Sequence, residues 1–298
     1  MIGGQRRRRV AGCLRSGVCV LLLALAARTP ALSDPQPQPA TRIVSLAPHL
    51  TELAFSAGAG ERIVATVDYS DHPPQARQIP RIGDAFRVDL ERLISLRPDE
   101  VLVWASGTPV QTIERIRALH LPVVTFETYR LEDVSSAVRS IGRLAGTSAI
   151  AEPAAAAFDN EMRTLREQYR ARPRVSVFMQ INDRPLYTVN GRHIISEIIE
   201  LCGGRNVFAG LDELAPAIGI EAVIAANPQV IIATSDTVPD AVASWSKWRH
   251  IDAVRSGNVY TLPSDDIARA TLRLTDGARE MCRTLDTARQ RLEAAASH

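Results

Sequence analysis

The chain has 298 residues, 46% of them hydrophobic and 23% charged, which is typical of a globular protein of about two domains. Six of its 35 basic residues lie in the first 33 positions, which contain no acid, so the rest carries 29 basic against 33 acidic residues. This balance excludes a strongly basic nucleic-acid-binding surface.

The N-terminus has the layout of a secretory signal peptide. The basic stretch MIGGQRRRRVAGCLRSG precedes the short apolar run VCVLLLALAA, and TPALS ends with Ala31 and Ser33 at positions −3 and −1 of a cleavage site. The apolar run is too short for a permanent membrane anchor. We therefore predict that residues 1–33 are removed on export and that residues 34–41, DPQPQPAT, form an extended tether.

Two cysteines, Cys202 and Cys282, remain after the predicted cleavage. An even pair of cysteines in an oxidising compartment is more often a disulfide than a metal site or a nucleophile. We expect a bond between these two residues to attach the last helix to its own domain.

Strand and helix patterns alternate in the first half of the chain. Strands are expected at 42–47, 62–67, 100–104 and 122–127, and helices at 49–58, 90–96, 108–120 and 131–146. A long loop, 68–86, lies between the second strand and the helix that Asp89 caps. This alternation predicts a mainly parallel sheet with helices on both faces, in a first lobe spanning residues 42–147.

One long helix follows, over residues 148–172, with Pro153 near its start. A second alternation, in residues 173–298, has strands expected at 174–180, 186–189, 229–235 and 259–262 and helices at 193–204, 221–227, 238–248 and 271–296. We therefore predict an α/β fold of two Rossmann-like lobes joined by a single long connecting helix, with a ligand cleft between the lobes.

The pattern of a helix, a turn and a strand occurs twice in the sequence. VDLERLISLRPDEVLVW (88–104) and GIEAVIAANPQVIIATS (219–235) each place a glutamate, Glu91 or Glu221, seven positions before a proline. An acid in the first turn stabilises a helix by roughly 0.3–1 kcal/mol, which could explain one of them. Matched carboxylates on two related lobes also suit docking on a two-fold symmetric, arginine-bearing partner.

Enzyme signatures are absent. The chain has no G-x-S-x-G, no P-loop, no H-E-x-x-H and no dinucleotide fingerprint in the required context, so we do not expect an enzyme. Aromatic and charged residues do stand at strand ends and in loops, where α/β folds bind ligands. They suit a flat, largely apolar ligand, although Trp104 and Tyr187 could instead pack in their cores. The candidates are Tyr69, Trp104, Tyr187, Asp265 and Arg269.

Two histidines, His49 and His72, follow neighbouring strands and could meet as metal or haem ligands. Both positions also suit ordinary capping or surface residues. Because no third ligand is evident, no metal site is predicted.

The sequence resembles a family of periplasmic substrate-binding proteins whose two α/β lobes are joined by one rigid helix and which serve ABC importers of cobalamin, haem and ferric siderophores. RIVSLAPHLTELAFSAG, DYSDHPPQA, VDLERLISLRPDEVLVW, IIELCGGRNVF and EAVIAANPQVII are most similar to segments of the cobalamin binders, in the same order. The resemblance implies a periplasmic, non-catalytic protein without a cofactor of its own. Such a protein binds a corrinoid and delivers it, as a monomer, to an ABC importer permease dimer at the inner membrane.

The resemblance also implies roles for individual residues. Glu91 and Glu221 match the paired glutamates that meet permease arginines, and Cys202 and Cys282 match the disulfide of the family. The expected ligand-binding residues are Pro48, Tyr69, Phe86, Trp104, Tyr187, Asp265 and Arg269.

Two positions depart from the pattern of the cobalamin binders. Ala85 and Ala215 stand where those proteins have wall tryptophans, so a wider or less aromatic pocket is expected. Haem or a ferric siderophore on the same fold is the alternative ligand. An exported enzyme acting on such a ligand, and a scaffold protein with an empty cleft, are the alternatives of other classes.

Overall fold

The computed structural model describes residues 38–84 and 86–297. The predicted signal peptide, residues 34–37 of the predicted tether and Ala85 lie outside this range. Residues Pro39–His298 form one compact unit. Within the described part of the chain, no helix has both the length and the apolar character needed to cross a bilayer.

The first half of the unit is built on a four-stranded sheet in the order β2-β1-β3-β4, and all its paired strands are parallel. Its strands are β1 (Ile43–Ser45), β2 (Ile63–Ala65), β3 (Glu100–Trp104) and β4 (Val123–Phe126). The helices of this N-terminal lobe are α1 (Pro48–Ser56), α2 (Leu90–Ser95), α3 (Val110–Ala118) and α4 (Leu131–Leu144), with short 3-10 turns η1 (Gly60–Arg62) and η2 (Pro74–Gln78). The predicted alternation is confirmed in this half.

The C-terminal lobe has a second parallel sheet, in the order β10-β9-β5-β8. Its strands are β5 (Val175–Gln180), β8 (Gly204–Asn206), β9 (Val230–Thr234) and β10 (Val259–Leu262), and β6 (Asn182–Asp183) pairs antiparallel with β7 (Leu186–Tyr187). The helices are α6 (Ile194–Leu201), α7 (Ile220–Ala226), α8 (Ala241–Trp245), α9 (Asp252–Arg255), α10 (Ser264–Ile267) and α11 (Leu274–Ala296). The predicted α/β class with parallel sheets in two lobes is therefore correct.

Several details of the C-terminal lobe differ from the expected elements. The strand β6 and the short helices α9 and α10 were not expected, and the helix expected at 238–248 is only α8. The edge strand β8 was not expected, because its residues Gly204–Asn206 lack apolar alternation and extend only through pairing with β5. The expected strand 186–189 is only the short β7. The last helix begins at Leu274, because α10 and the turn after it occupy the preceding residues.

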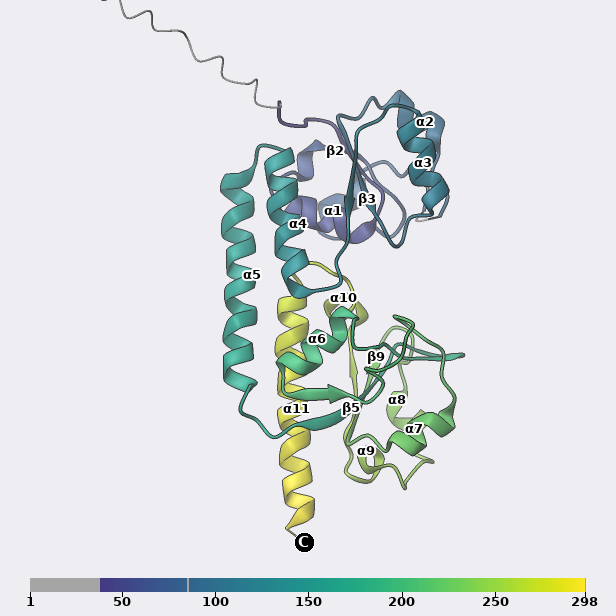
Figure 1. The fold of residues 1–298 in the computed structure, drawn as a ribbon, viewed down its shortest axis with the longest axis vertical. Coiled ribbons are helices and arrows are strands. Elements are labelled where there is room, and N and C mark those ends of the chain that lie inside the picture. The colour runs from purple at the N-terminus through teal and green to yellow at the C-terminus, as the bar shows by residue number, and fades with distance from the viewer. Residues whose placement is uncertain (1–37, 85, 298) are drawn as a thin grey trace, which may run out of the picture. The chain divides into compact units, whose positions relative to one another are not determined.

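The long helix α5 (Ser148–Tyr169) has 22 residues, which corresponds to a length of about 33 Å. Its alanine-rich sequence favours a helix, and Pro153 lies close enough to the start to be tolerated. Every third or fourth residue is buried, along a stripe formed by Ala151, Ala155, Phe158, Met162, Leu165 and Tyr169. In Figure 1, α5 runs beside α4, against which it packs, and it also contacts α11.

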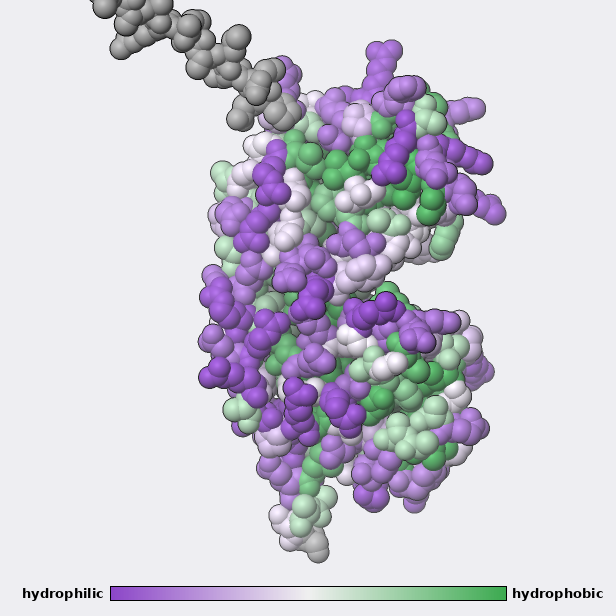
Figure 2. Space-filling view, viewed as in Figure 1, coloured by the Kyte–Doolittle hydropathy of each residue, from purple (hydrophilic) through white to green (hydrophobic). Residues whose placement is uncertain are grey.

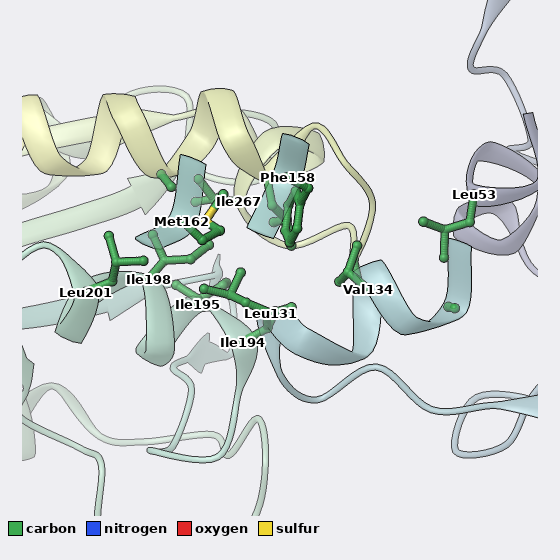
Figure 3. Close-up of a cluster of buried hydrophobic side chains, with 14 of the residues drawn as sticks. Leu53, Leu131, Val134, Phe158, Met162, Ile194, Ile195, Ile198, Leu201 and Ile267 are labelled. Atoms are coloured by element: carbon green, nitrogen blue, oxygen red, sulfur yellow. The ribbon is translucent and has the colours of Figure 1, made fainter. Parts of the chain in front are cut away.

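The buried stripe of α5 belongs to a hydrophobic core that residues of both sheets share. Figure 3 shows Phe158 and Met162 of α5 close to Leu131 of α4, Ile195 of α6 and Ile267 of α10, all members of one buried cluster. A disulfide joins Cys202, at the end of α6, to Cys282 in α11, as expected. Both cysteines are completely buried, so the bond lies within the packed core.

The duplicated sequence forms the same local structure twice, as α2 followed by β3 and as α7 followed by β9. The Asp89 carboxylate caps α2 by accepting a hydrogen bond of 2.9 Å from the Arg92 backbone N–H. Glu91 and Glu221 lie in the first turns of their helices, and both are exposed. Neither side chain forms an ion pair with another described residue.

Candidate functional site

The candidate site begins where the parallel strands of the first sheet end. Trp104 is the last residue of β3 and pairs with Phe126 at the end of β4, so Glu127 follows at the same edge of the sheet. Pro48 and His49 begin α1, just after β1. The carboxyl edge of a parallel sheet is where α/β folds bind ligands.

Side chains from this edge and from the C-terminal lobe surround a cavity of about 500 Å³, here called the cleft. Figure 2 shows the surface hollowed between the two lobes on the side away from α5. The cleft is lined by Pro48, His49, Trp104, Ser106, Glu127, Thr128, Tyr129, His193, Ile194, Leu214, Ala215, Ser264, Asp265, Ala268, Arg269 and Ala270.

The indole of Trp104 has a fixed position in this wall. Its Nε1–H donates a 3.1 Å hydrogen bond to Glu127 Oε1, which also accepts a 2.7 Å bond from Ser106 Oγ. A Cβ at Gly107 would lie 1.8 Å from Trp104 Cε3, so only glycine lets the backbone approach the ring this closely. The ring is therefore preorganised as one wall of the cleft.

His49 packs edge-on against Trp104, with ring centroids 5.1 Å apart. The residue is only 8% exposed, and its Nε2 is buried without a hydrogen-bond partner among the described residues. Burial, aided by the nearby charge of Arg269, lowers the pKa of His49 to about 4. The imidazole that packs against Trp104 is consequently neutral at physiological pH.

Two arginines after β10 form ion pairs with carboxylates of the N-terminal lobe. Arg269 Nη1 lies 3.1 Å from Asp71 Oδ1, and Arg273 Nε lies 3.1 Å from Oε1 of the buried Glu52. Asp265 contacts both arginines, at 3.0 Å and 3.3 Å. Burial raises the pKa of the Asp71 carboxyl, but the hydrogen bond and charge of Arg269 outweigh this effect and the net pKa is lowered. These contacts attach the C-terminal wall of the cleft to the N-terminal lobe.

The structure brings part of the predicted ligand set together. Pro48, Trp104, Asp265 and Arg269 all line the cleft, as does Ala215, one of the two positions where a less aromatic wall is expected.

Tyr69, Phe86 and Tyr187 are not among the lining residues. Tyr69 is 79% exposed and has a φ of 65°, and Phe86 is 72% exposed. Tyr187 is half-buried, and it pairs with Asn182 in the short hairpin. The roles of these three residues stay predictions.

The two histidines considered as metal ligands do not share a cavity. His49 lines the cleft, whereas His72 lines a separate hollow that also includes Glu52 and Arg273. Within residues 38–84 and 86–297 no group of three or more His, Cys, Asp or Glu side chains could hold a metal ion.

Several lining residues were not predicted from the sequence. Glu127 could have been found, because it is the last residue of a predicted strand and lies at the edge where ligands bind. His193 caps α6, and its Nδ1 accepts a 3.2 Å hydrogen bond from the Ile195 N–H. Burial lowers the pKa of His193 to about 4. Nothing local distinguishes this cap from any other, so only the fold places it in the cleft.

The chain is similar to known binding proteins along most of its length. The family model "Periplasmic binding protein" matches residues 43–266. The chain is 34% identical to the vitamin B12-binding protein of Vibrio campbellii over 254 residues, which is 85% of this chain and 92% of that protein.

Solved structures support the same grouping. The periplasmic vitamin B12 binding protein BtuF of Vibrio cholerae superposes with a TM-score of 0.78 at 32% identity, over 84% of this chain and 98% of that one. The periplasmic heme-binding protein RhuT from Roseiflexus sp. RS-1 shares the fold, with a TM-score of 0.73 at 23% identity over 83% and 98% of the two chains. These are binding proteins and not enzymes, and the chain belongs to the periplasmic binding protein family.

Proposed function

We propose that this protein captures a corrinoid in the cleft and delivers it to an ABC importer of the inner membrane. The observation that carries the proposal is the fixed indole of Trp104 beside Pro48 and the neutral His49. Such a wall suits a broad, largely apolar macrocycle, and a preformed wall lowers the entropic cost of binding. The relatives above 30% identity are named for binding vitamin B12.

Binding would involve both lobes. Asp265 and Arg269, which line the same cleft as Trp104, offer charged contacts to the amide-bearing rim of a corrin. Tyr69 and Phe86 have large exposed aromatic faces that a ligand could cover, and with Tyr187 they complete the proposed ligand-binding set. Ala215 in the wall supports a roomier site than a tryptophan there would leave.

Delivery would depend on the two matched glutamates. Glu91 and Glu221 are exposed in equivalent first turns of α2 and α7, where their carboxylates are available to a two-fold symmetric permease dimer. We further propose that the protein is a monomer, that cleavage after Ser33 releases it into the periplasm, and that residues 42–147, 148–172 and 173–298 are its lobes and connecting helix.

Titration of the mature protein with cyanocobalamin, haem and a ferric siderophore tests this function. Calorimetry should give saturable binding of the corrinoid and much weaker binding of the other two. Trp104→Ala should weaken binding of the corrinoid, because the variant loses the fixed aromatic wall of the cleft. Saturable binding of haem or the siderophore without binding of the corrinoid would overturn the proposal, as would an affinity that Trp104→Ala leaves unchanged.

A further inference from the structure

A second cavity of about 440 Å³ adjoins the cleft. Tyr129 and Leu214 line both spaces, so the two lie side by side. The remaining lining residues of this second cavity, here called the arginine compartment, are Arg130, Gly191, Arg192 and Glu197. A ligand too large for the 500 Å³ cleft therefore has a defined space into which a substituent can extend.

The charge in this compartment is positive. Glu197 is its one lining carboxylate, and it is shared by Arg130 at 3.5 Å and by the neighbouring Arg166 at 3.4 Å. Glu197 also accepts a 2.8 Å hydrogen bond from the Leu131 backbone N–H. Arg130 also lies 3.1 Å from the exposed Glu132. Glu197 and Glu132 are thus engaged by Arg130 and Arg166, and neither carboxylate forms an ion pair with Arg192.

Arg192 is the guanidinium without a compensating charge. It forms no ion pair with any carboxylate of the described residues, and it donates a hydrogen bond to the backbone carbonyl of Asp212. A carbonyl oxygen carries no net charge, so Arg192 retains its full positive charge at the cavity wall.

The backbone that carries Arg192 is held in place. The buried Asn190 accepts a 2.9 Å hydrogen bond from the Arg192 N–H through its Oδ1 and donates one of 3.0 Å to the Leu211 carbonyl. The Gly191 N–H donates to the Ala209 carbonyl at 2.9 Å, and a Cβ on Gly191 would lie 2.9 Å from that same oxygen. The position therefore needs glycine, and Arg192 is presented from a preorganised segment.

We propose that the arginine compartment binds an anionic arm of the ligand, and that Arg192 determines specificity for this arm. The inference rests on the proposed function. In a complete corrinoid the anionic group outside the ring is the phosphodiester of the nucleotide loop, whereas the other ring substituents end in neutral amides. The planar fork of a guanidinium matches two phosphate oxygens, which a neutral arm would not provide.

Calorimetry of the mature protein with two corrinoids tests the inference. Cyanocobalamin carries the phosphodiester, and dicyanocobinamide has the same corrin ring without the phosphodiester and nucleotide. Arg192→Gln should lower the affinity for cyanocobalamin roughly tenfold or more and change the affinity for dicyanocobinamide by no more than about twofold. Only cyanocobalamin loses a charged hydrogen bond in this variant. Arg192→Lys should retain part of the preference for cyanocobalamin over dicyanocobinamide, because lysine keeps the positive charge but not the planar fork. Arg205→Gln, at an exposed arginine of β8 that lines neither cavity, is the matched control and should change neither affinity.

The outcomes separate the two proposals. If Arg192→Gln lowers the affinity for both corrinoids equally, or for neither, the anionic-arm inference is overturned. The proposal that the unsubstituted protein binds a corrinoid would still stand. Failure of both corrinoids to bind the unsubstituted protein overturns the proposed function and, with it, this inference.

Discussion

Arg269 and Asp71 lie 198 positions apart in the sequence, and their side chains meet at 3.1 Å across the two lobes. The neighbouring pair, Arg273 with Glu52, is far more buried, since the Glu52 side chain is only 4% exposed and that of Asp71 is 50% exposed. Two ion pairs of similar geometry thus join the lobes in very different surroundings, and they should contribute differently to stability.

Removal of the buried partner should be the more damaging change. Glu52→Ala leaves the partly buried Arg273 with only Asp265 and Asp266 as carboxylate partners, and we expect the free energy of unfolding to fall by about 1–3 kcal/mol. Asp71→Asn removes a solvent-screened contact and should cost at most about 1 kcal/mol. Urea unfolding of both variants measures the difference. Equal effects would mean that the two pairs contribute alike despite their different burial.

The buried histidine of the cleft predicts a pH dependence of stability. The pKa of His49 is about 4 in the folded protein and 6.5 in its unperturbed state, so between these values the unfolded chain binds a proton that the folded protein does not. Stability should therefore rise as the pH increases from about 4 to about 6.5, by up to about 3 kcal/mol from this group.

Urea unfolding at pH 5 and pH 7.5 tests this slope. His49→Gln should show a smaller loss of stability at pH 5 than the unsubstituted protein, with the remainder partly due to His193. His250→Gln, at an exposed histidine, is the control and should keep the full slope. An unchanged slope in His49→Gln would contradict the assignment to this residue.

The disulfide should make a large contribution to stability. Cys202 and Cys282 are separated by 80 positions, and a cross-link over such a loop stabilises a protein by about 2–5 kcal/mol. Replacement of both cysteines by serine should lower the unfolding free energy by that amount in urea. Reduction of the unsubstituted protein should have a similar effect, whereas the double variant should be insensitive to reductant. A double variant as stable as the native protein would show that packing of α11 suffices.

The two matched glutamates should act in transport and not in ligand binding. Charge reversal of both, Glu91→Arg with Glu221→Arg, should abolish corrinoid-dependent growth of cells that rely on this protein, while calorimetry gives unchanged affinity. Reversal at two other exposed glutamates, Glu167→Arg with Glu293→Arg, changes the net charge by the same amount and should leave growth intact. If cells with Glu91→Arg and Glu221→Arg still grow, the two glutamates are not needed for transport, and the repeated helix, turn and strand is only a structural duplication.

The local elements were determined by the sequence itself. Apolar periodicity predicted all but one strand of the two parallel sheets, and the cap at Asp89 and the alanine-rich composition predicted α2 and α5, because these signals act within a few residues. The ends of parallel strands also identified Trp104 and Arg269 as cleft residues. The strand β8 escaped prediction, since its polar residues extend only by pairing with β5.

The assembled site was decided by tertiary structure. The arginine compartment joins Tyr129, Arg192, Glu197 and Leu214 from separate segments, and no local pattern distinguishes Arg192 from the other arginines of the chain. Likewise, His49 and His72 both follow strands, yet packing buries one in the cleft and places the other in a different hollow. Sequence periodicity reports which face of an element is buried, whereas the net charge of a cavity depends on which distant side chains packing brings within ion-pair distance.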